Sequence, residues 1–297
     1  MVRYLAAALL ALIIVSCAPP KEEPRKDIYT QDFETSVAFL VLESNGKPQI
    51  TASGFIADKE QGIFYTAKHF TDEFGSLGHE YCRVFFNGRV YKAILVKVPP
   101  TQDAGLIRLL PPFSPENLQE PMPIATVRPK VGDKIFAQGF HSHPFWLRME
   151  NEASGFPETV VPILADYYKQ IMRDLSREQE VVFHNLESEA VEPRFNPVFP
   201  DSNVYENDGY IKVLFPRDHK FSFGGLSGGA ARNDRGEVVG IMTAQDIYRF
   251  EYDENGLFFD PHSGQFGMEI KKQIYDTLYV TPIDTLQDLR NYVSTLK

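Results

Sequence analysis

The stretch FGGLSGG at residues 223–229 surrounds Ser227 with four glycines and decides how the rest of the chain is interpreted. Glycine lets a backbone approach a bound molecule closely and turn its N–H groups toward it. Acyl-transfer chemistry needs such preset donors, because they meet the oxyanion of the tetrahedral intermediate. A turn signal, NDRG at 233–236, follows at once. Ser227 is therefore a candidate nucleophile held in a tight loop.

Two earlier segments supply possible partners for this serine. TAKH at 66–69 ends in His69, a candidate base, and DAGLI at 103–107 begins with Asp103, a candidate acid. A serine becomes nucleophilic when a base lies beside it and a third group orients that base. Each residue alone also has an ordinary interpretation, as a histidine after a strand, a turn aspartate and a loop serine.

The first part of the chain has the pattern of short strands without intervening helices. The dipeptide Asn87-Gly88 between two apolar runs predicts a tight hairpin. A series of this kind favours an antiparallel barrel or sandwich. The predicted strands are 37–42, 50–56, 63–66, 83–86, 89–98 and 106–110.

A second block of strands is predicted at 131–139, 210–215, 238–244 and 279–281. It is interrupted over about 148–209, where apolar residues from Val160 to Leu175 recur at helical spacing. A helix packed on a barrel is the simpler interpretation of this insertion, and a lid or partner-binding surface is the alternative. A further helix is predicted from Pro282 to Val293.

The N-terminus has the pattern of an export signal. Arg3 precedes an apolar run at 5–15 that is too short for an ordinary membrane span. The run ends in IVSC at 14–17, which resembles the bacterial lipobox. The resemblance implies a signal peptide at 1–16, lipidation of Cys17 and an exported protein anchored to a bacterial membrane, on the periplasmic side or at the cell surface. An ordinary signal peptide is the alternative.

Composition limits the remaining possibilities. The region 17–35 is rich in Pro, Lys and Glu and predicts a solvated tether. A net charge of −10 argues against nucleic acid as a partner, because phosphate binding needs a basic surface. The only other cysteine is Cys82, so lipidation of Cys17 would leave no intramolecular disulfide. Cys82 lies in a strand pattern and is expected to be a small core residue.

Taken together, these segments resemble the trypsin-like (chymotrypsin-fold) serine peptidases, nearest the HtrA/Deg branch. The resemblance implies an all-β fold of two six-stranded antiparallel β-barrels over 36–297, with a helical insertion in the second barrel and a C-terminal helix. The matching segments are SGFI at 53–56, TAKH at 66–69, DAGLIRL at 103–109, GLSGG at 225–229, GEVVGI at 236–241 and VTPID at 280–284.

The resemblance also implies roles for individual residues. Ser227 would attack a carbonyl carbon, His69 would take its proton, and Asp103 would orient His69. The N–H groups of Gly225 and Ser227 would form the oxyanion hole. The expected activity is that of a serine endopeptidase acting on a protein or peptide substrate, without a cofactor or metal, and the oligomeric state is left open.

The chain departs from the pattern of these peptidases in two places. Leu226 stands where they usually carry Asp or Asn, and Ala230 replaces the usual proline. An apolar residue beside the nucleophile raises the question of the resting geometry of the loop. Phe221 falls where the base of the P1 pocket is expected, which suggests a hydrophobic or small P1 residue.

Other functions fit the sequence less well. The pattern GxSxG also occurs in α/β-hydrolases, but their order Ser, Asp, His would require His262 as the base, and alternating strands and helices are absent. His141 and His143 could form a metal pair, yet no cysteine or carboxylate pattern completes a site, and His219 is equally unremarkable. An inactive peptidase-fold lipoprotein that binds peptides as a scaffold is the remaining alternative.

Overall fold

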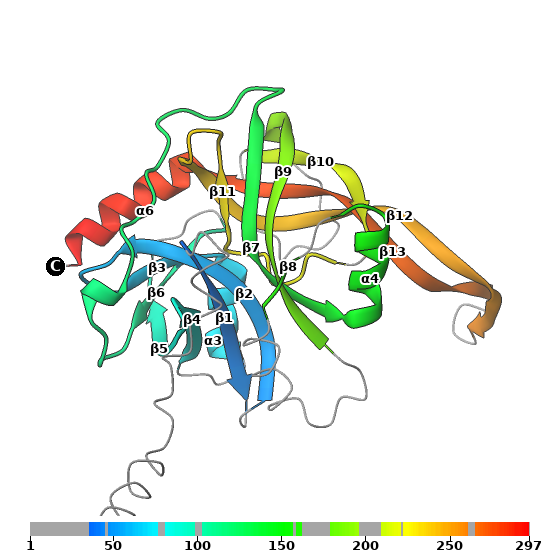
Figure 1. Ribbon diagram of the computed structural model, residues 1–297, viewed down its shortest axis with the longest axis horizontal. Coiled ribbons are helices and arrows are strands. Elements are labelled where there is room, and N and C mark those ends of the chain that lie inside the picture. Colours follow the sequence, from blue (N-terminus) through cyan, green and yellow to red (C-terminus); the bar gives the residue numbers. More distant parts are fainter. Residues whose placement is uncertain are drawn as a thin grey trace, which may run out of the picture.

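The computed structural model of the protein describes residues 36–44, 47–76, 81–98, 103–156, 159–161, 179–195, 209–220, 222–260 and 265–296. The signal peptide, Cys17, the tether, Phe221, His262 and most of the helix expected at 160–175 lie outside them. The described residues form two antiparallel barrels that lie side by side (Figure 1). This is the all-β, two-barrel architecture that the sequence predicts.

The first barrel closes in the order β1-β2-β3-β6-β5-β4. All six strands fall where the sequence predicts them, with ends shifted by a few residues. Asn87 and Gly88 both take positive φ angles of 49° and 67°, as the tight hairpin between β4 and β5 requires. The strands are β1 (Val37–Ser44), β2 (Lys47–Asp58), β3 (Ile63–Thr66), β4 (Cys82–Phe86), β5 (Arg89–Val96) and β6 (Gly105–Leu109).

The apolar run at the start of β1 is buried on both of its faces. Ala38, Leu40 and Leu42 belong to the cluster inside the first barrel. Val37, Phe39 and Val41 point the other way, into a cluster shared with residues of the second barrel. Alternate residues of a strand face opposite sides, so only a strand between two cores needs such a continuous run. Its composition therefore reflects the packing of one barrel on the other.

Cys82 lies inside the first barrel, as expected of a core residue, with 1% of its surface exposed. Burial raises the pKa of its thiol, which keeps the group protonated and unreactive.

The second barrel follows the order β10-β13-β12-β11-β7-β9 and closes through pairing of β10 with β9, while β8 (Thr159–Val160) adds to β9 outside the ring. Helix α4 (Phe145–Ala153) follows β7, and the 3₁₀ turn η1 (Pro115–Asn117) lies between the barrels in sequence. The ring strands are β7 (Lys134–Pro144), β9 (Gln179–Phe195), β10 (Tyr210–His219), β11 (Ala230–Arg232), β12 (Val238–Asp260) and β13 (Gln265–Pro282).

Strand β9 lies within the range that the sequence marks as an insertion, yet it is part of the barrel wall. It pairs with β7 from Lys134↔Glu189 to Pro144↔Gln179. Its inward positions include the polar residues His184 and Ser188, which are buried, while Glu187 and Glu189 on either side of Ser188 are exposed. Polar residues on the inner face hide the apolar–polar alternation that identifies a strand. The described part of the insertion thus contributes α4 and also this strand.

Strands β12 and β13 pair from Gly240↔Pro282 to Asp260↔Gln265. They continue beyond the barrel as a long hairpin, seen at the right of Figure 1. The sequence predicts only the parts of these strands that lie in the barrel wall.

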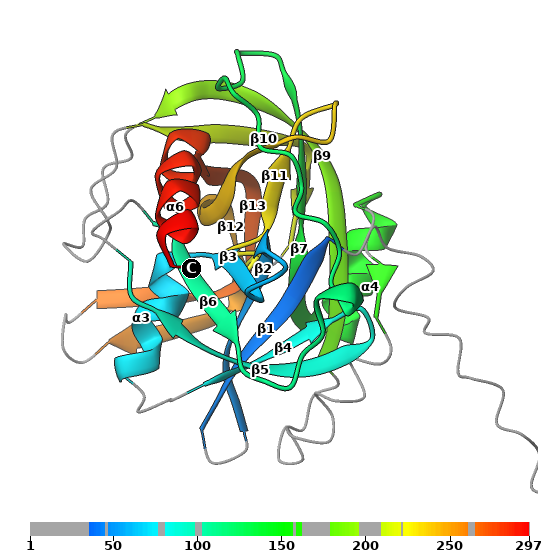
Figure 2. The ribbon, with the colours of Figure 1, turned by 90° about the vertical axis from the view of Figure 1, so that its left-hand side faces the viewer.

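Helix α6 (Ile283–Thr295) confirms the predicted C-terminal helix and joins the two barrels. Its apolar face, with Leu286, Leu289 and Val293, is buried in the cluster between them. Figure 2 shows α6 lying against strands of both barrels. Among the described residues, no helix has both the length and the apolar character needed to span a bilayer.

Candidate active site

His69 and Asp103 meet at the end of a strand pair in the first barrel. Thr66 at the end of β3 pairs with Gly105 at the start of β6, so the residues just outside these strands are neighbours. Helix α3 (Lys68–Ser76) begins here and carries His69 as its second residue. The sequence predicts His69 and Asp103 as a pair but does not predict helix α3.

Asp103 holds His69 with both of its carboxylate oxygens. The backbone N–H of His69 donates to Oδ1 at 2.9 Å, and Nδ1 lies 2.7 Å from Oδ2. An ionised carboxylate only accepts hydrogen bonds, so Nδ1 carries the proton and Nε2 is the free basic nitrogen. Asp103 thereby fixes both the position and the tautomer of the imidazole.

The environment makes His69 a stronger base. Asp103 is 5% exposed, whereas the side chain of His69 is 41% exposed. Burial lowers the pKa of His69, but the hydrogen bond and charge of Asp103, with smaller contributions from Asp72 and Glu73, outweigh it and raise the pKa above its usual value.

Gly105 lets α3 pack this closely on β6. A Cβ atom at Gly105 would lie 2.8 Å from Oγ1 and 2.9 Å from Cγ2 of Thr71 in the helix. A larger residue would push α3 away and separate His69 from Asp103.

The serine loop, residues 222–229, is pressed against the first barrel. Gly228 takes a φ of +87°, and a Cβ there would lie 2.1 Å from the carbonyl oxygen of Ser53 and 2.4 Å from Oγ1 of Thr66. The N–H of Ser53 donates to the carbonyl oxygen of Ser227 at 2.7 Å. Glycine at 228 therefore allows the second barrel to bring Ser227 to the strand that leads to His69.

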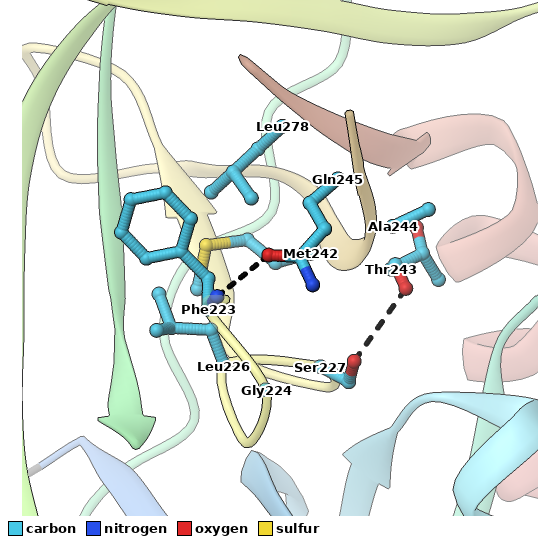
Figure 3. Close-up of a pocket in the computed structure, with 9 residues that line it drawn as sticks. All are labelled: Phe223, Gly224, Leu226, Ser227, Met242, Thr243, Ala244, Gln245 and Leu278. Atoms are coloured by element: carbon cyan, nitrogen blue, oxygen red, sulfur yellow. Dashed lines mark hydrogen bonds between the residues drawn. The ribbon is translucent and has the colours of Figure 1, made fainter. Parts of the chain in front are cut away.

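The hydroxyl of Ser227 bonds to a backbone carbonyl oxygen and not to His69. Its Oγ donates to the carbonyl oxygen of Thr243 at 3.5 Å (Figure 3), and no hydrogen bond joins it to His69 among the described residues. Rotation about χ1 moves a serine hydroxyl between staggered positions. Catalytic hydrogen bonds are often long or misdirected before substrate binds. The structure thus joins His69 to Asp103 directly and places Ser227 in a loop that bonds to the same barrel, with its hydroxyl on Thr243.

A pair of threonines connects the serine side of the site to the aspartate side. Oγ1 of Thr243 lies 3.0 Å from Oγ1 of Thr281, which in turn donates to the carbonyl oxygen of Asp103 at 3.4 Å. One buried network therefore links Thr243, whose carbonyl oxygen accepts a hydrogen bond from Ser227, to the backbone of Asp103.

The N–H groups of the serine loop divide into two sets. Those of Leu226, Gly228 and Gly229 donate to carbonyl oxygens of Phe223, Met242 and Leu226 at 3.0, 2.7 and 2.8 Å. Those of Gly225 and Ser227 make no hydrogen bond within the described part of the chain. The first set folds the loop, and the second set consists of the two N–H groups expected to form the oxyanion hole.

Leu226 holds the serine loop through its side chain. Its side chain is 1% exposed and packs in the core of the second barrel with Phe223 and Met242. Burial of a leucine side chain is worth about 1.5–3 kcal/mol. The apolar residue beside Ser227 therefore anchors the loop by core packing.

A small pocket lies beside Ser227, with a volume of about 50 Å³. Leu226, Met242, Phe223 and Leu278 gather on one side of it (Figure 3). Gln245 accepts from the N–H of Phe223 at 2.6 Å and donates to Ser222 Oγ at 2.6 Å, so its amide is fixed. The described lining carries no charge, and it consists of Phe223, Gly224, Leu226, Ser227, Met242, Thr243, Ala244, Gln245 and Leu278.

Ser53 is a site residue whose role the sequence does not reveal. Its fully buried Oγ accepts from the N–H of Phe140 at 2.8 Å and donates to the carbonyl oxygen of Gly225 at 2.9 Å. Thr243 and Thr281 were likewise missed. Its position in the SGFI segment was the one sequence feature that pointed to Ser53. Its contacts with Phe140 and Gly225 arise only when the two barrels pack together.

Three histidines also meet inside the second barrel: His141, His184 and His219. His141 is thus brought to His184 and His219, which lie on other strands. They are the described residues that could hold a metal ion.

No protein-family model matches the chain, and no curated protein matches its sequence. Among solved structures, it resembles the inactive form of Rv3671c from M. tuberculosis H37Rv, a serine-to-alanine mutant, with a TM-score of 0.50 and 13% identity over 94% of this chain and 96% of that chain. The active form of the Rv3671c protease from M. tuberculosis gives a TM-score of 0.49 and 14% identity over 91% of this chain and 86% of that chain. The first likeness, with the barrel topology, shows that the chain has the trypsin-like serine protease fold.

Proposed function

We propose that the protein is a serine endopeptidase that uses His69, Asp103 and Ser227. The observation that carries this proposal is the pair of hydrogen bonds that His69 donates to Asp103, from its backbone N–H and from Nδ1, which leaves Nε2 as the basic nitrogen. Purely structural packing would not require a carboxylate to fix both the backbone and the ring of one histidine.

The proposed reaction begins when the Ser227 hydroxyl turns from Thr243 toward His69. Oγ attacks the substrate carbonyl carbon, and His69 Nε2 takes the hydroxyl proton. The oxyanion is met by the N–H groups of Gly225 and Ser227. His69 then protonates the leaving amine, and water releases the acyl group by the same steps in reverse. Asp103 stabilises the imidazolium in each half, in agreement with the raised pKa of His69.

The size of the pocket limits the P1 residue. A volume of about 50 Å³ is small for a side-chain pocket and favours a compact P1 side chain over a long one. Its apolar side, with Met242 and Leu278, disfavours charge. We therefore propose a preference for a small apolar residue at P1.

We also propose that the peptidase is exported and held at a bacterial membrane by a lipid on Cys17. The support is the apolar run at 5–15 and the IVSC sequence that ends it. Cys17→Ala is expected to move the protein from the membrane fraction and abolish its labelling by a fatty-acid probe.

The proposed activity is tested by incubating the purified protein with a peptide library and locating the cleaved bonds by mass spectrometry. His69→Ala and Ser227→Ala should each lower kcat/KM by about 10⁴-fold or more. Ser188→Ala is the matched control, because it removes a buried hydroxyl that bonds to the carbonyl of Ile135 in the second barrel.

A peptide-binding scaffold is the second candidate, favoured by the hydroxyl of Ser227 pointing at Thr243. Binding of library peptides without cleavage, unchanged by Ser227→Ala, would support the scaffold over the enzyme.

A further inference from the structure

The interior of the second barrel contains three histidines from three strands. His141 lies on β7, His184 on β9 and His219 at the end of β10, and each has 0% of its surface exposed. Histidine is only occasionally buried completely, because its ring carries two polar nitrogens. The strands bring the three residues together from positions far apart in the sequence.

The three rings face one another at short range. Their centroids are 4.9 Å apart for His141–His184, 5.3 Å for His141–His219 and 5.8 Å for His184–His219. One nitrogen of each ring can be chosen so that all three lie within 4.8 Å of one another. Three nitrogens bound to one zinc ion in a tetrahedron lie about 3.4 Å apart. Small rotations of the rings would therefore bring them to a common ion.

The surroundings favour the protonation state that binds a metal. Phe156 and Phe223 pack on the histidines, with Phe156–His219 centroids 4.7 Å apart and Phe223–His219 centroids 4.3 Å apart. Three imidazolium ions this close in an apolar enclosure would repel one another strongly. Neutral imidazole is the form that coordinates a metal ion.

We propose that His141, His184 and His219 bind a divalent transition-metal ion, with Zn²⁺ as the best fit. The donors are three imidazole nitrogens, which suit zinc and its neighbours and not Mg²⁺ or Ca²⁺. The described residues add no cysteine or carboxylate to this group, so one coordination position is left for a non-protein ligand.

The site is placed to fasten the serine loop. Phe223, whose ring stacks on His219, accepts with its carbonyl oxygen the N–H of Leu226. On the other side, the Cα of His141 lies 3.1 Å from where a Cβ on Gly225 would be. An ion held by the three histidines would tie β7, β9 and the end of β10 together directly behind Gly225. A contribution of this link to catalysis rests on the proposed peptidase function, whereas the binding of the ion does not.

The test begins with the full-length protein after removal of metals by a chelator. Titration with Zn²⁺ in competition with a chromophoric chelator should show one equivalent bound. Co²⁺ in its place should give the intense visible absorption of a tetrahedral site. Binding should raise Tm by about 5 °C or more at a hundredfold excess over Kd.

Two variants with conservative shapes locate the ion. His219→Phe keeps the stacking on Phe223, and His184→Gln keeps a polar side chain. Each should weaken Zn²⁺ binding more than about 100-fold, beyond the cost of losing a second-sphere partner. His69→Ala is the matched control and should bind one equivalent with unchanged affinity. That variant lacks the proposed catalytic base, so failure of the peptidase proposal and failure of the metal proposal are distinguishable.

X-ray absorption of the zinc-loaded wild-type protein provides a readout that needs no variant. Three imidazole ligands at about 2.0 Å would support the site. The proposal is overturned if the wild-type protein binds no ion, if the bound ion has fewer than two imidazole ligands, or if the folded variants bind it as tightly as the wild type.

Discussion

Removal of the Ser53 hydroxyl should damage both the stability and the activity of the protein. Ser53 lies on β2 in the first barrel, yet its Oγ connects Phe140 on β7 to Gly225 in the serine loop. In Ser53→Ala the N–H of Phe140 and the carbonyl oxygen of Gly225 both lose this partner. The backbone N–H of residue 53 can still donate to Ser227, so the loop is loosened without being released.

The magnitude follows from these two groups. A buried polar group left without its partner costs about 1–3 kcal/mol, so the loss of two partners in Ser53→Ala should lower the free energy of unfolding by about 2–6 kcal/mol. Loss of a complete oxyanion-hole donor costs about 10²–10³ in kcat. Gly225 keeps its N–H and loses only its anchor, so we expect kcat/KM to fall by about tenfold.

Urea denaturation and peptide hydrolysis measure the two effects separately. Ser188→Ala is the control, since its buried hydroxyl also bonds to a backbone carbonyl, that of Ile135 on β7, and not to the serine loop. The control should lose stability and keep kcat/KM. If folded Ser53→Ala kept kcat/KM within twofold of the wild type, the argument that Ser53 positions Gly225 would be wrong.

Three further predictions concern the loop, the base and the pocket. Leu226→Ala should lower the free energy of unfolding, measured by urea denaturation, by about 2–5 kcal/mol. Leu226→Asp should lower it further, because a carboxylate would enter an apolar core. Equal losses for the two variants would contradict the role of Leu226 as a buried anchor. The activity should rise with pH through a midpoint above about 6.5, the ordinary value for histidine, because the pKa of His69 is raised. Asp103→Asn should lower the pH midpoint of the activity. Its loss of unfolding free energy relative to the wild type should be largest below pH of about 6.5 and should shrink as the pH rises through the raised pKa of His69. A loss independent of pH would argue against an ion pair between Asp103 and His69. Met242→Ala should enlarge the pocket and improve cleavage after leucine relative to alanine by about tenfold, measured as a ratio of kcat/KM values, and an unchanged ratio would show that the pocket does not bind P1.

The first barrel could be predicted from the sequence because its strands carry their own signals. The positive φ angles at Asn87 and Gly88 are what that dipeptide predicts. The continuous run 37–42 correctly indicated a strand, although its burial between two cores became clear only from the packing. Helix α3 was missed, because KHFTDEFGS lacks a capping residue and follows directly on a strand.

Strand β9 shows where sequence patterns fail. Its inner face includes His184 and Ser188, which a strand pattern counts as polar and therefore exposed. The same misinterpretation conceals the three-histidine cluster. His141 and His219 were judged singly, and His184 could not be associated with them until the register of β7 with β9 placed it opposite Gly139.

The candidate site was identified by residue order, and its geometry was not. His69 and Asp103 are hydrogen-bonded to each other, as the resemblance implies. The direction of the Ser227 hydroxyl depends on the carbonyl oxygen of Thr243, which lies on β12, whereas Ser227 lies in the loop before β11. Contacts of this kind depend on tertiary packing and leave no local pattern.

The central claim is that His69 activates Ser227 as a nucleophile. The most direct measurement is reaction of the purified protein with a fluorophosphonate, followed by peptide mass spectrometry to locate the adduct. The account predicts one adduct, on Ser227, absent from Ser227→Ala and strongly reduced in His69→Ala. A folded wild-type protein that stays unlabelled, or that is labelled equally well without His69, would contradict it.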